Sequence, residues 1–189
     1  MLIKEENAGV NCKDHGGSMP LIYAIHLKLI KVLIDANANV NAKNNTGKTA
    51  LEYAIIYNQS EIVKALLEAG SSVDKYLINN VKKVNADIKE LVLNYYNLFN
   101  QAKDKTFGSK EILREAIEKG YIAIVKYLLK KQISIDAEDL KLAKINNKKA
   151  IGKMIISHSG LSTKVSGISS KGLGVMPEIA NLIASFIHE

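Results

Sequence analysis

Residues that could carry chemistry are few in this chain and lie far apart. Cys12 and His15 have the two-residue gap of half a zinc site, but no second pair of Cys or His follows at the required spacing. Neither His26 nor His158 has a nucleophile or an orienting carboxylate nearby in the sequence. The segment Gly172-Leu173-Gly174 lacks the preceding strand and the third glycine of a dinucleotide-binding loop. We therefore predict a protein without a catalytic site, a metal or a cofactor.

The elements that would position a binding surface are better defined. Residues 42–74 form one unit in which apolar side chains recur three and four apart, as on the buried faces of two short helices. Thr49 is placed to cap the first helix, and Gly70 suits the left-handed turn that ends the second. The apolar positions are Leu51, Ala54 and Ile55 in the first helix and Ile62, Val63, Leu66 and Leu67 in the second.

This 33-residue unit resembles an ankyrin repeat almost position by position. The family pattern is D-x-x-G-x-T-P-L-H-x-A followed by V-V-x-x-L-L-x-x-G-A-x-V-N. The chain matches it at Asn44, Gly47, Thr49 to Ala54, Glu61 to Val63, Leu66, Leu67, Gly70, Val73 and Asp74. The resemblance implies a stack of helix pairs with projecting fingers, which binds other proteins and carries no chemistry of its own.

The same unit recurs along the chain in altered form. With Ala54 as the marker of the inner helix, equivalent positions fall at Ala24, Asn80, Ala116 and Ala143. The first repeat has three residues fewer between its helices. The repeats that follow residues 74 and 136 are about six residues shorter than a 33-residue unit, and this shortening removes the finger.

Apolar spacing further predicts a longer helix over residues 86–99, a linker over 101–108, and a helix pair at 140–145 and 150–157. The predicted fold class is an all-α ankyrin-repeat solenoid with a separate C-terminal helix. Its predicted segments are the tail of a truncated repeat at 1–13, the solenoid at 14–158 (fingered repeats at 14–74, divergent repeats at 75–158), a Ser/Gly-rich linker at 159–174 and the terminal helix at 175–189.

In ankyrin proteins the fingertips and the concave face of the inner helices contact the target, so the resemblance implies a protein-binding surface. Ile56 and Tyr57 stand at concave positions that normally face solvent, where they either anchor an interface or pack against the shortened neighbouring repeat. The predicted contact residues are His15, Ser18, Lys43, Asn45, Thr46, Lys48, Ile56, Tyr57, Glu118 and Lys119.

The C-terminal segment predicts an amphipathic helix that starts near Pro177. It resembles the opening helix of the F-box, L-P-x-E-[IL]-x-x-x-I-x-x-[FY]-L, and its placement is similar to the PRANC motifs of ankyrin effectors from intracellular bacteria and large DNA viruses. The resemblance implies recruitment of Skp1 to a cullin-based ubiquitin ligase. The alternative is a helix that caps the last repeat. The residues concerned are Pro177, Glu178, Ile179, Ile183, Phe186 and Ile187.

Composition limits the remaining alternatives. A single cysteine and the lack of an apolar leader or a long apolar run predict a cytoplasmic protein, or one in a host cytoplasm if it is exported. The net charge of +7 arises in residues 75–189, which hold 19 Lys and Arg against 11 Asp and Glu. Nucleic-acid binding is therefore a third possibility. Its phosphate contacts would be the pairs Lys82-Lys83, Lys130-Lys131 and Lys148-Lys149.

Overall fold

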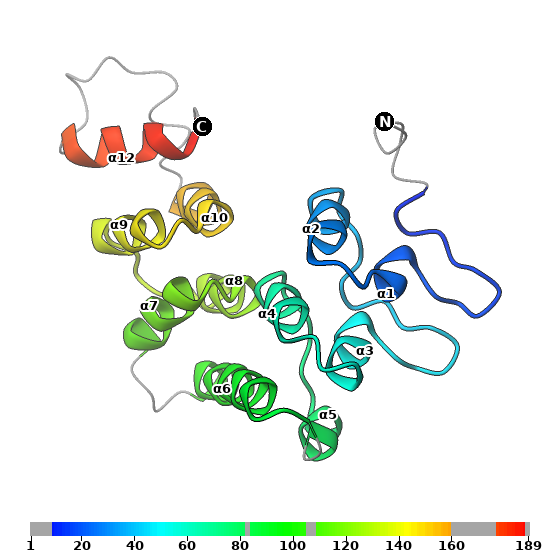
Figure 1. The fold of residues 1–189 in the computed structure, drawn as a ribbon. Helices are drawn as coiled ribbons and strands as arrows, with labels where there is room; N and C mark the ends of the chain where they lie inside the picture. Colours follow the sequence, from blue (N-terminus) through cyan, green and yellow to red (C-terminus); the bar gives the residue numbers. More distant parts are fainter. Residues whose placement is uncertain (1–8, 82–83, 105–108, 160–176, 188–189) are drawn as a thin grey trace. The chain divides into compact units, whose positions relative to one another are not determined.

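The regular elements of the chain are helices, as predicted. The computed structural model describes residues 9–81, 84–104, 109–159 and 177–187, and within these residues there are no β-strands (Figure 1). Contacts between Cα atoms divide the chain into two compact units, Met1–Phe99 and Asn100–Glu189. Each unit is built by the same local rules, so the two are described in turn.

The first unit contains two helix pairs stacked in register. The first pair is α1 (Pro20–Tyr23) and α2 (Leu27–Asp35), and the second is α3 (Ala50–Ile56) and α4 (Ser60–Glu68). Within the stack α1 contacts α3 and α2 contacts α4, which gives an inner and an outer layer of helices (Figure 1). The four residues of α1 reflect the three residues missing from this repeat.

The predicted ends of the second pair are confirmed. The Thr49 hydroxyl accepts the Glu52 N–H while the Glu52 carboxylate accepts the Thr49 N–H, so this helix start has a full capping box. Gly70 follows α4 with φ of 95°, a left-handed conformation that only glycine adopts without steric cost. The predicted apolar faces, from Leu51 to Leu67, are all buried.

One way of ending a helix recurs in both units. After α2, α3, α4, α7 and α9 a left-handed residue is followed by a residue whose N–H donates to a carbonyl five positions back. This arrangement is a Schellman motif, which satisfies carbonyls that a helix end would leave without partners. The left-handed residues are Asn37, Asn58, Gly70, Gly120 and Asn147.

The first unit closes with α5 (Lys75–Asn80) and the start of α6 (Ala86–Lys103). Asp74 caps α5 by accepting the Leu77 N–H. Two predictions are wrong here. Asn80, the expected inner-helix marker, is exposed, and the predicted linker at 101–108 begins later, because Gln101 to Lys103 continue α6 with strong helix formers. Residues 105–108 lie outside the described part.

The second unit repeats the two-layer scheme. Its helices are α7 (Ser109–Lys119), α8 (Ile122–Lys130), α9 (Ala137–Ile145), α10 (Lys149–Ser159) and α12 (Pro177–Ile187). Contacts join α7 to α9 and α8 to α10, while α12 lies on α9 and α10 (Figure 1). The predicted helix pair at 140–145 and 150–157 is thus confirmed. Residues 160–174 of the predicted linker lie outside the described residues.

A buried carboxylate links α7 to α9. Asp139 is fully buried and accepts a hydrogen bond from Lys110, and its Oδ1 lies 3.5 Å from Nε of Arg114. Lys110 also lies 3.1 Å from Asp136. Burial alone lowers the pKa of Lys110, but its hydrogen bonds to Asp139 and Asp136 outweigh burial and raise that pKa above 10.5.

The same contacts act on the pKa of Asp136 in the opposite direction. Burial alone raises this pKa, but the hydrogen bond from Lys110 and the Asp139 N–H outweigh burial and hold it below 3.8. Asp136 and Asp139 also form the capping box that starts α9. The cap of α9 and its tie to α7 therefore share the same two carboxylates.

Candidate protein-binding surface

The two fingers of the first unit close with the same turn. In each finger the first residue donates its N–H to the carbonyl of the fifth and accepts the N–H of a left-handed glycine: Asp14 with Ser18 and Gly17, and Asn44 with Lys48 and Gly47. The side chain of the first residue also accepts the N–H of the fifth, at 2.8 Å in the first finger and 2.9 Å in the second. Each turn is therefore closed both by backbone hydrogen bonds and by a side-chain hydrogen bond.

A tyrosine on the inner helix braces each finger. The Tyr23 hydroxyl donates to the Asp14 carboxylate, and the Asn44 amide donates to the Tyr53 hydroxyl at 3.1 Å. The hydrogen bond from Tyr23 is the largest cause of a lowered pKa at Asp14, followed by the backbone N–H of Ser18. Because both ties repeat at a spacing of 30 residues, the fingers have a common geometry relative to α1 and α3.

Asn45 joins the two fingers to each other. Its backbone N–H donates to the Gly16 carbonyl at 2.9 Å, and its side-chain amide donates to the His15 carbonyl at 3.2 Å. The same side chain packs so closely on Gly17 that an added Cβ there would lie 2.2 Å from Asn45 Oδ1. Asn45, predicted as a contact residue, therefore also positions the first finger.

Two asparagines tie each repeat to the next one. The amide of Asn11 donates to the Asn37 carbonyl and its oxygen accepts the Asn39 N–H. Thirty residues later, Asn41 makes the same two bonds, to the Gly70 carbonyl at 3.2 Å and from the Ser72 N–H at 2.7 Å. Each asparagine thus fixes the loop that follows the next outer helix. These hydrogen bonds were not predicted from the sequence.

Large apolar side chains are exposed on this unit. Ile56 and Tyr57, at the end of α3, are 55% and 64% exposed, and the Tyr57 ring stacks on Tyr53 with centroids 6.3 Å apart. Both side chains are therefore mostly open to solvent. Tyr23 and Ile25, which were not among the predicted contact residues, are 62% and 59% exposed. The available signal was their apolar type at the end of the short α1 and two residues after it.

The predicted contact residues do not all reach the surface. His15, Lys43, Asn45 and Thr46 are exposed, and Lys48 is half-buried. Ser18 is a correction: it is buried, because its backbone closes the first turn against Asp14.

The two contact residues predicted in α7 belong to the second unit. Glu118 is exposed, while Lys119 is half-buried and paired at 2.7 Å with Glu115 one turn earlier.

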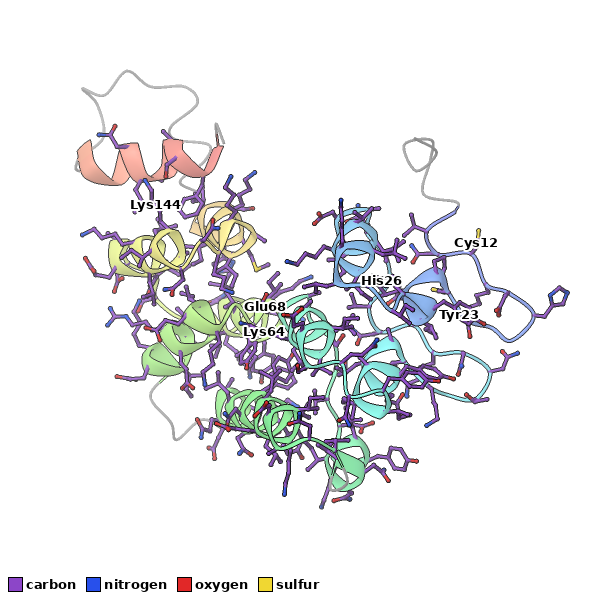
Figure 2. All side chains as sticks on the ribbon, viewed as in Figure 1. Cys12, Tyr23, His26, Lys64, Glu68 and Lys144 are labelled. Carbon is purple, nitrogen blue, oxygen red and sulfur yellow. The ribbon has the colours of Figure 1, made fainter. Side chains whose placement is uncertain are left out.

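No metal centre is formed by the described residues, among which three ligating side chains do not gather at any point. Cys12 and His15 are both exposed on the first finger segment, and His26 precedes α2 (Figure 2). In the same part of the chain no helix has the length and apolar character needed to cross a membrane.

Two of the three predicted lysine pairs lie among the described residues of the second unit, one at the end of α8 and one at the start of α10. Lys130 and Lys131 are exposed at the end of α8, and the Lys131 ammonium lies 5.6 Å from the centre of the Tyr127 ring. Lys148 is half-buried beside Gly120, in the turn before α10. Lys82 and Lys83 lie outside the described residues.

The C-terminal helix uses part of its apolar stripe inside the second unit. Ile183 is fully buried and Phe186 is 3% exposed, where α12 lies on α9 and α10. The ring of Phe186 lies directly on Gly152 of α10. The side chains of Pro177, Glu178, Ile179 and Ile187 lie outside the described set, although all four residues belong to α12.

Comparison with known proteins agrees with the repeat geometry. Residues 1–76 match the family model for ankyrin repeats in three copies. No curated protein matches the chain. The match covers the two fingers, the helix pairs α1–α2 and α3–α4, and both asparagine ties. The described residues are helical in both units, and residues 1–76 match ankyrin repeats, which suggest a protein–protein interaction module.

Proposed function

We propose that the chain binds a protein partner through one surface of its first unit, which we call the finger–helix surface. The observation that carries this proposal is the exposure of large apolar side chains beside two rigid fingers. The surface comprises His15, Lys43, Asn45 and Thr46 from the fingers, Tyr23 and Ile25 from the first repeat, and Ile56 and Tyr57 from the second.

The geometry suits recognition at low entropic cost. Tyr57 is held by stacking on Tyr53, and the Tyr23 hydroxyl is tied to Asp14, so both rings are ordered before a partner arrives. Tyrosine offers a large contact area with only two rotatable bonds, which is why it is frequent among residues that dominate binding energy. The fingers and the end of α3 are about 10 Å apart along the helix, so one partner can reach both.

The test compares two apolar sites of similar exposure. Proximity labelling in the native cell identifies proteins near the full chain, and each purified candidate is then titrated calorimetrically. The double variant Ile56→Ser/Tyr57→Ala should weaken binding at least tenfold, which corresponds to about 1.4 kcal/mol. Ile145→Ser is the matched control, because Ile145 is 80% exposed but lies in α9 of the second unit. Equal losses in both variants, or none in the first, would refute the proposal.

For α12 we propose the role of a cap. The burial of Ile183 and Phe186 against α10 supports this role, since an end repeat otherwise exposes an apolar face. The F-box-like adaptor hypothesis, including a host-directed effector role, instead requires these two side chains to leave α10 and contact Skp1.

A retention assay separates the two roles. Purified Skp1 is passed over the immobilised full chain and over a chain that lacks residues 175–189. Retention that disappears with the deletion would establish the adaptor role and reject a purely structural cap. If neither protein retains Skp1, the adaptor hypothesis is rejected, and a lower melting temperature of the shortened chain then supports the cap.

A further inference from the structure

The second finger has two backbone carbonyls whose equivalents in the first finger accept hydrogen bonds from the neighbouring finger. Between the fingers, the carbonyls of His15 and Gly16 accept the side-chain and backbone N–H groups of Asn45. The residues thirty positions later, Asn45 and Thr46, are the equivalents of these acceptors. Their carbonyls receive no hydrogen bond from any described residue.

The finger that would donate to these two carbonyls is absent from the chain. At the equivalent point of the third repeat, Asp74 immediately caps α5, so the chain enters the helix and skips the turn. Asp74 occupies the place of Asn11 and Asn41 but has no amide to donate, and its carboxylate accepts the Leu77 N–H. The loss of the finger and the change from asparagine to aspartate therefore occur together.

The space that a third finger would fill is open. Beside Gly17 the Asn45 side chain leaves no room, but an added Cβ at Gly47, the equivalent glycine, would meet nothing within 4 Å. A cavity of about 330 Å³ lies at the base of the same finger, lined by Asn41 and Lys43, by Thr49 and Glu52 at the start of α3, and by Ser72 and Asp74. Its volume falls within the range of about 300–1,000 Å³ that is usual for ligand sites.

We call the open space beside Asn45, Thr46 and Gly47, together with the cavity at the base of this finger, the notch. We propose that the notch accepts a tight turn of a partner protein, with the sequence Asx-Asn-x-Gly, in place of the missing finger. The second residue of that turn would donate its backbone N–H to the Thr46 carbonyl and its side-chain amide to the Asn45 carbonyl. Its side chain would occupy the space beside Gly47. This inference specifies which kind of segment the partner would supply, and it rests on the proposed protein-binding function.

The probe is a cyclic peptide with the sequence of residues 42–49, which contains the turn Asn44-Asn45-Thr46-Gly47. Added to the isotope-labelled full chain, it should shift the backbone amide signals of residues 45–48 and 72–74 in NMR spectra. A peptide in which valine replaces the glycine cannot hold the left-handed turn and should bind at least tenfold more weakly. Shifts confined to other residues, no shifts, or equal binding of both peptides would overturn the proposal.

A substitution in the chain, rather than in the peptide, tests whether the space beside Gly47 is needed for binding. Gly47→Asn keeps the left-handed turn, which asparagine tolerates, but places a side chain in the notch and should reduce peptide affinity at least tenfold. The control Gln132→Asn makes a substitution at a left-handed position of the second unit and should leave affinity unchanged. Should Gly47→Asn not fold, Ser72→Arg fills the cavity from an exposed side chain and should have the same effect. Unchanged affinity in the folded variant contradicts the proposal.

Further results distinguish failure of the notch proposal from failure of the finger–helix surface. A dimer of the chain alone that Gly47→Asn abolishes, seen by analytical ultracentrifugation, would assign the notch to a second copy and overturn the partner turn. Failure of the peptide to bind would reject the notch while leaving the Ile56/Tyr57 test intact. Failure of that test, with the peptide still bound at residues 45–48, would reject the finger–helix surface alone.

Discussion

The ring of Phe186 in α12 lies against the backbone of Gly152 in α10. A Cβ added at Gly152 would stand 2.2 Å from Cε1 of Phe186, a distance that packed atoms do not reach. Ile183, one turn earlier on the same face, is fully buried. Because Gly152 has no side chain, α10 has room for Phe186, the largest apolar side chain of α12.

Replacing this glycine should loosen α12. Gly152→Ala forces Phe186 or the whole helix to move, and overpacking of this kind costs about 1–3 kcal/mol. We expect faster hydrogen exchange of the amides of residues 182–186 with little change in α7. Lys153→Ala, at the exposed neighbouring position, is the control and should leave exchange unchanged. Unaltered exchange in Gly152→Ala would mean that α12 does not rest on this contact.

Asn41→Asp tests the tie between repeats. The variant keeps the acceptor for the Ser72 N–H but loses the donor to the Gly70 carbonyl and places a negative charge beside that oxygen. Loss of the hydrogen bond should lower the free energy of unfolding by about 0.5–1.5 kcal/mol in urea titrations. Asn79→Asp adds the same charge at an exposed position of α5 and should change stability by less. Equal effects of the two variants would refute a specific tie.

Lys110→Met tests the buried network of the second unit. Removal of the ammonium leaves the buried Asp139 carboxylate with Arg114 as its one cationic neighbour among the described residues, and breaking a buried ion pair in this way costs about 3 kcal/mol. The exposed pair of Lys141 with Glu138 provides the comparison, because Lys141→Met should cost at most about 0.5 kcal/mol. Chemical unfolding followed by circular dichroism measures both. Similar values would show that burial of Asp139 does not depend on Lys110.

The same network predicts how stability depends on pH. Folding lowers the pKa of Asp136 below 3.8, so its contribution is complete at higher pH and is lost as pH falls through the folded pKa. Folding raises the pKa of Lys110 above 10.5, so its contribution is complete below that value and is lost as pH rises through the folded pKa. Urea unfolding at a series of pH values should show both losses. In Lys110→Met the alkaline loss should vanish and the acid loss should shrink; unchanged profiles would contradict the assignment.

Gln132→Gly should stabilise the protein. Gln132 follows α8 with φ of 60°, where a side chain clashes with the following carbonyl and glycine does not. After the greater freedom of glycine in the unfolded chain is subtracted, a gain of about 0.5–1 kcal/mol remains. Lys130→Gly, inside the last turn of α8, should instead destabilise by a similar amount. Thermal unfolding distinguishes the two, and a lower melting temperature for Gln132→Gly would contradict the argument.

Local features were predictable from sequence wherever neighbouring residues decide the conformation. The cap at Thr49, the left-handed Gly70 and the buried faces of α3 and α4 depend on residues within a few positions of one another, and each is confirmed. Because the pattern repeats at about 30 residues, the sequence also predicted the two fingers and the resemblance to ankyrin repeats. Periodicity was weaker at the end of α6, because Gln101 and Lys103 are polar helix formers and Ala102 is small, so they add little apolar signal.

The candidate surface was predictable only in outline. Exposure of Ile56 and Tyr57 could not be decided from their apolar type, because the same residues could have packed on a shortened neighbour. The double role of Asn45 depends on contacts between fingers that are thirty residues apart in the chain.

The sequence by itself determined the helix pairs, their caps and the ankyrin repeats of residues 1–76, because short-range spacing and hydrogen bonding are sufficient to specify them. The tertiary structure alone decided which apolar faces remain open. The sequence of α12 offered both Skp1 and the last repeat as surfaces for its apolar stripe, and in the structure Phe186 of that stripe lies on Gly152 of α10. Burial is a property of two surfaces brought together, and the sequence of one helix describes only one of them.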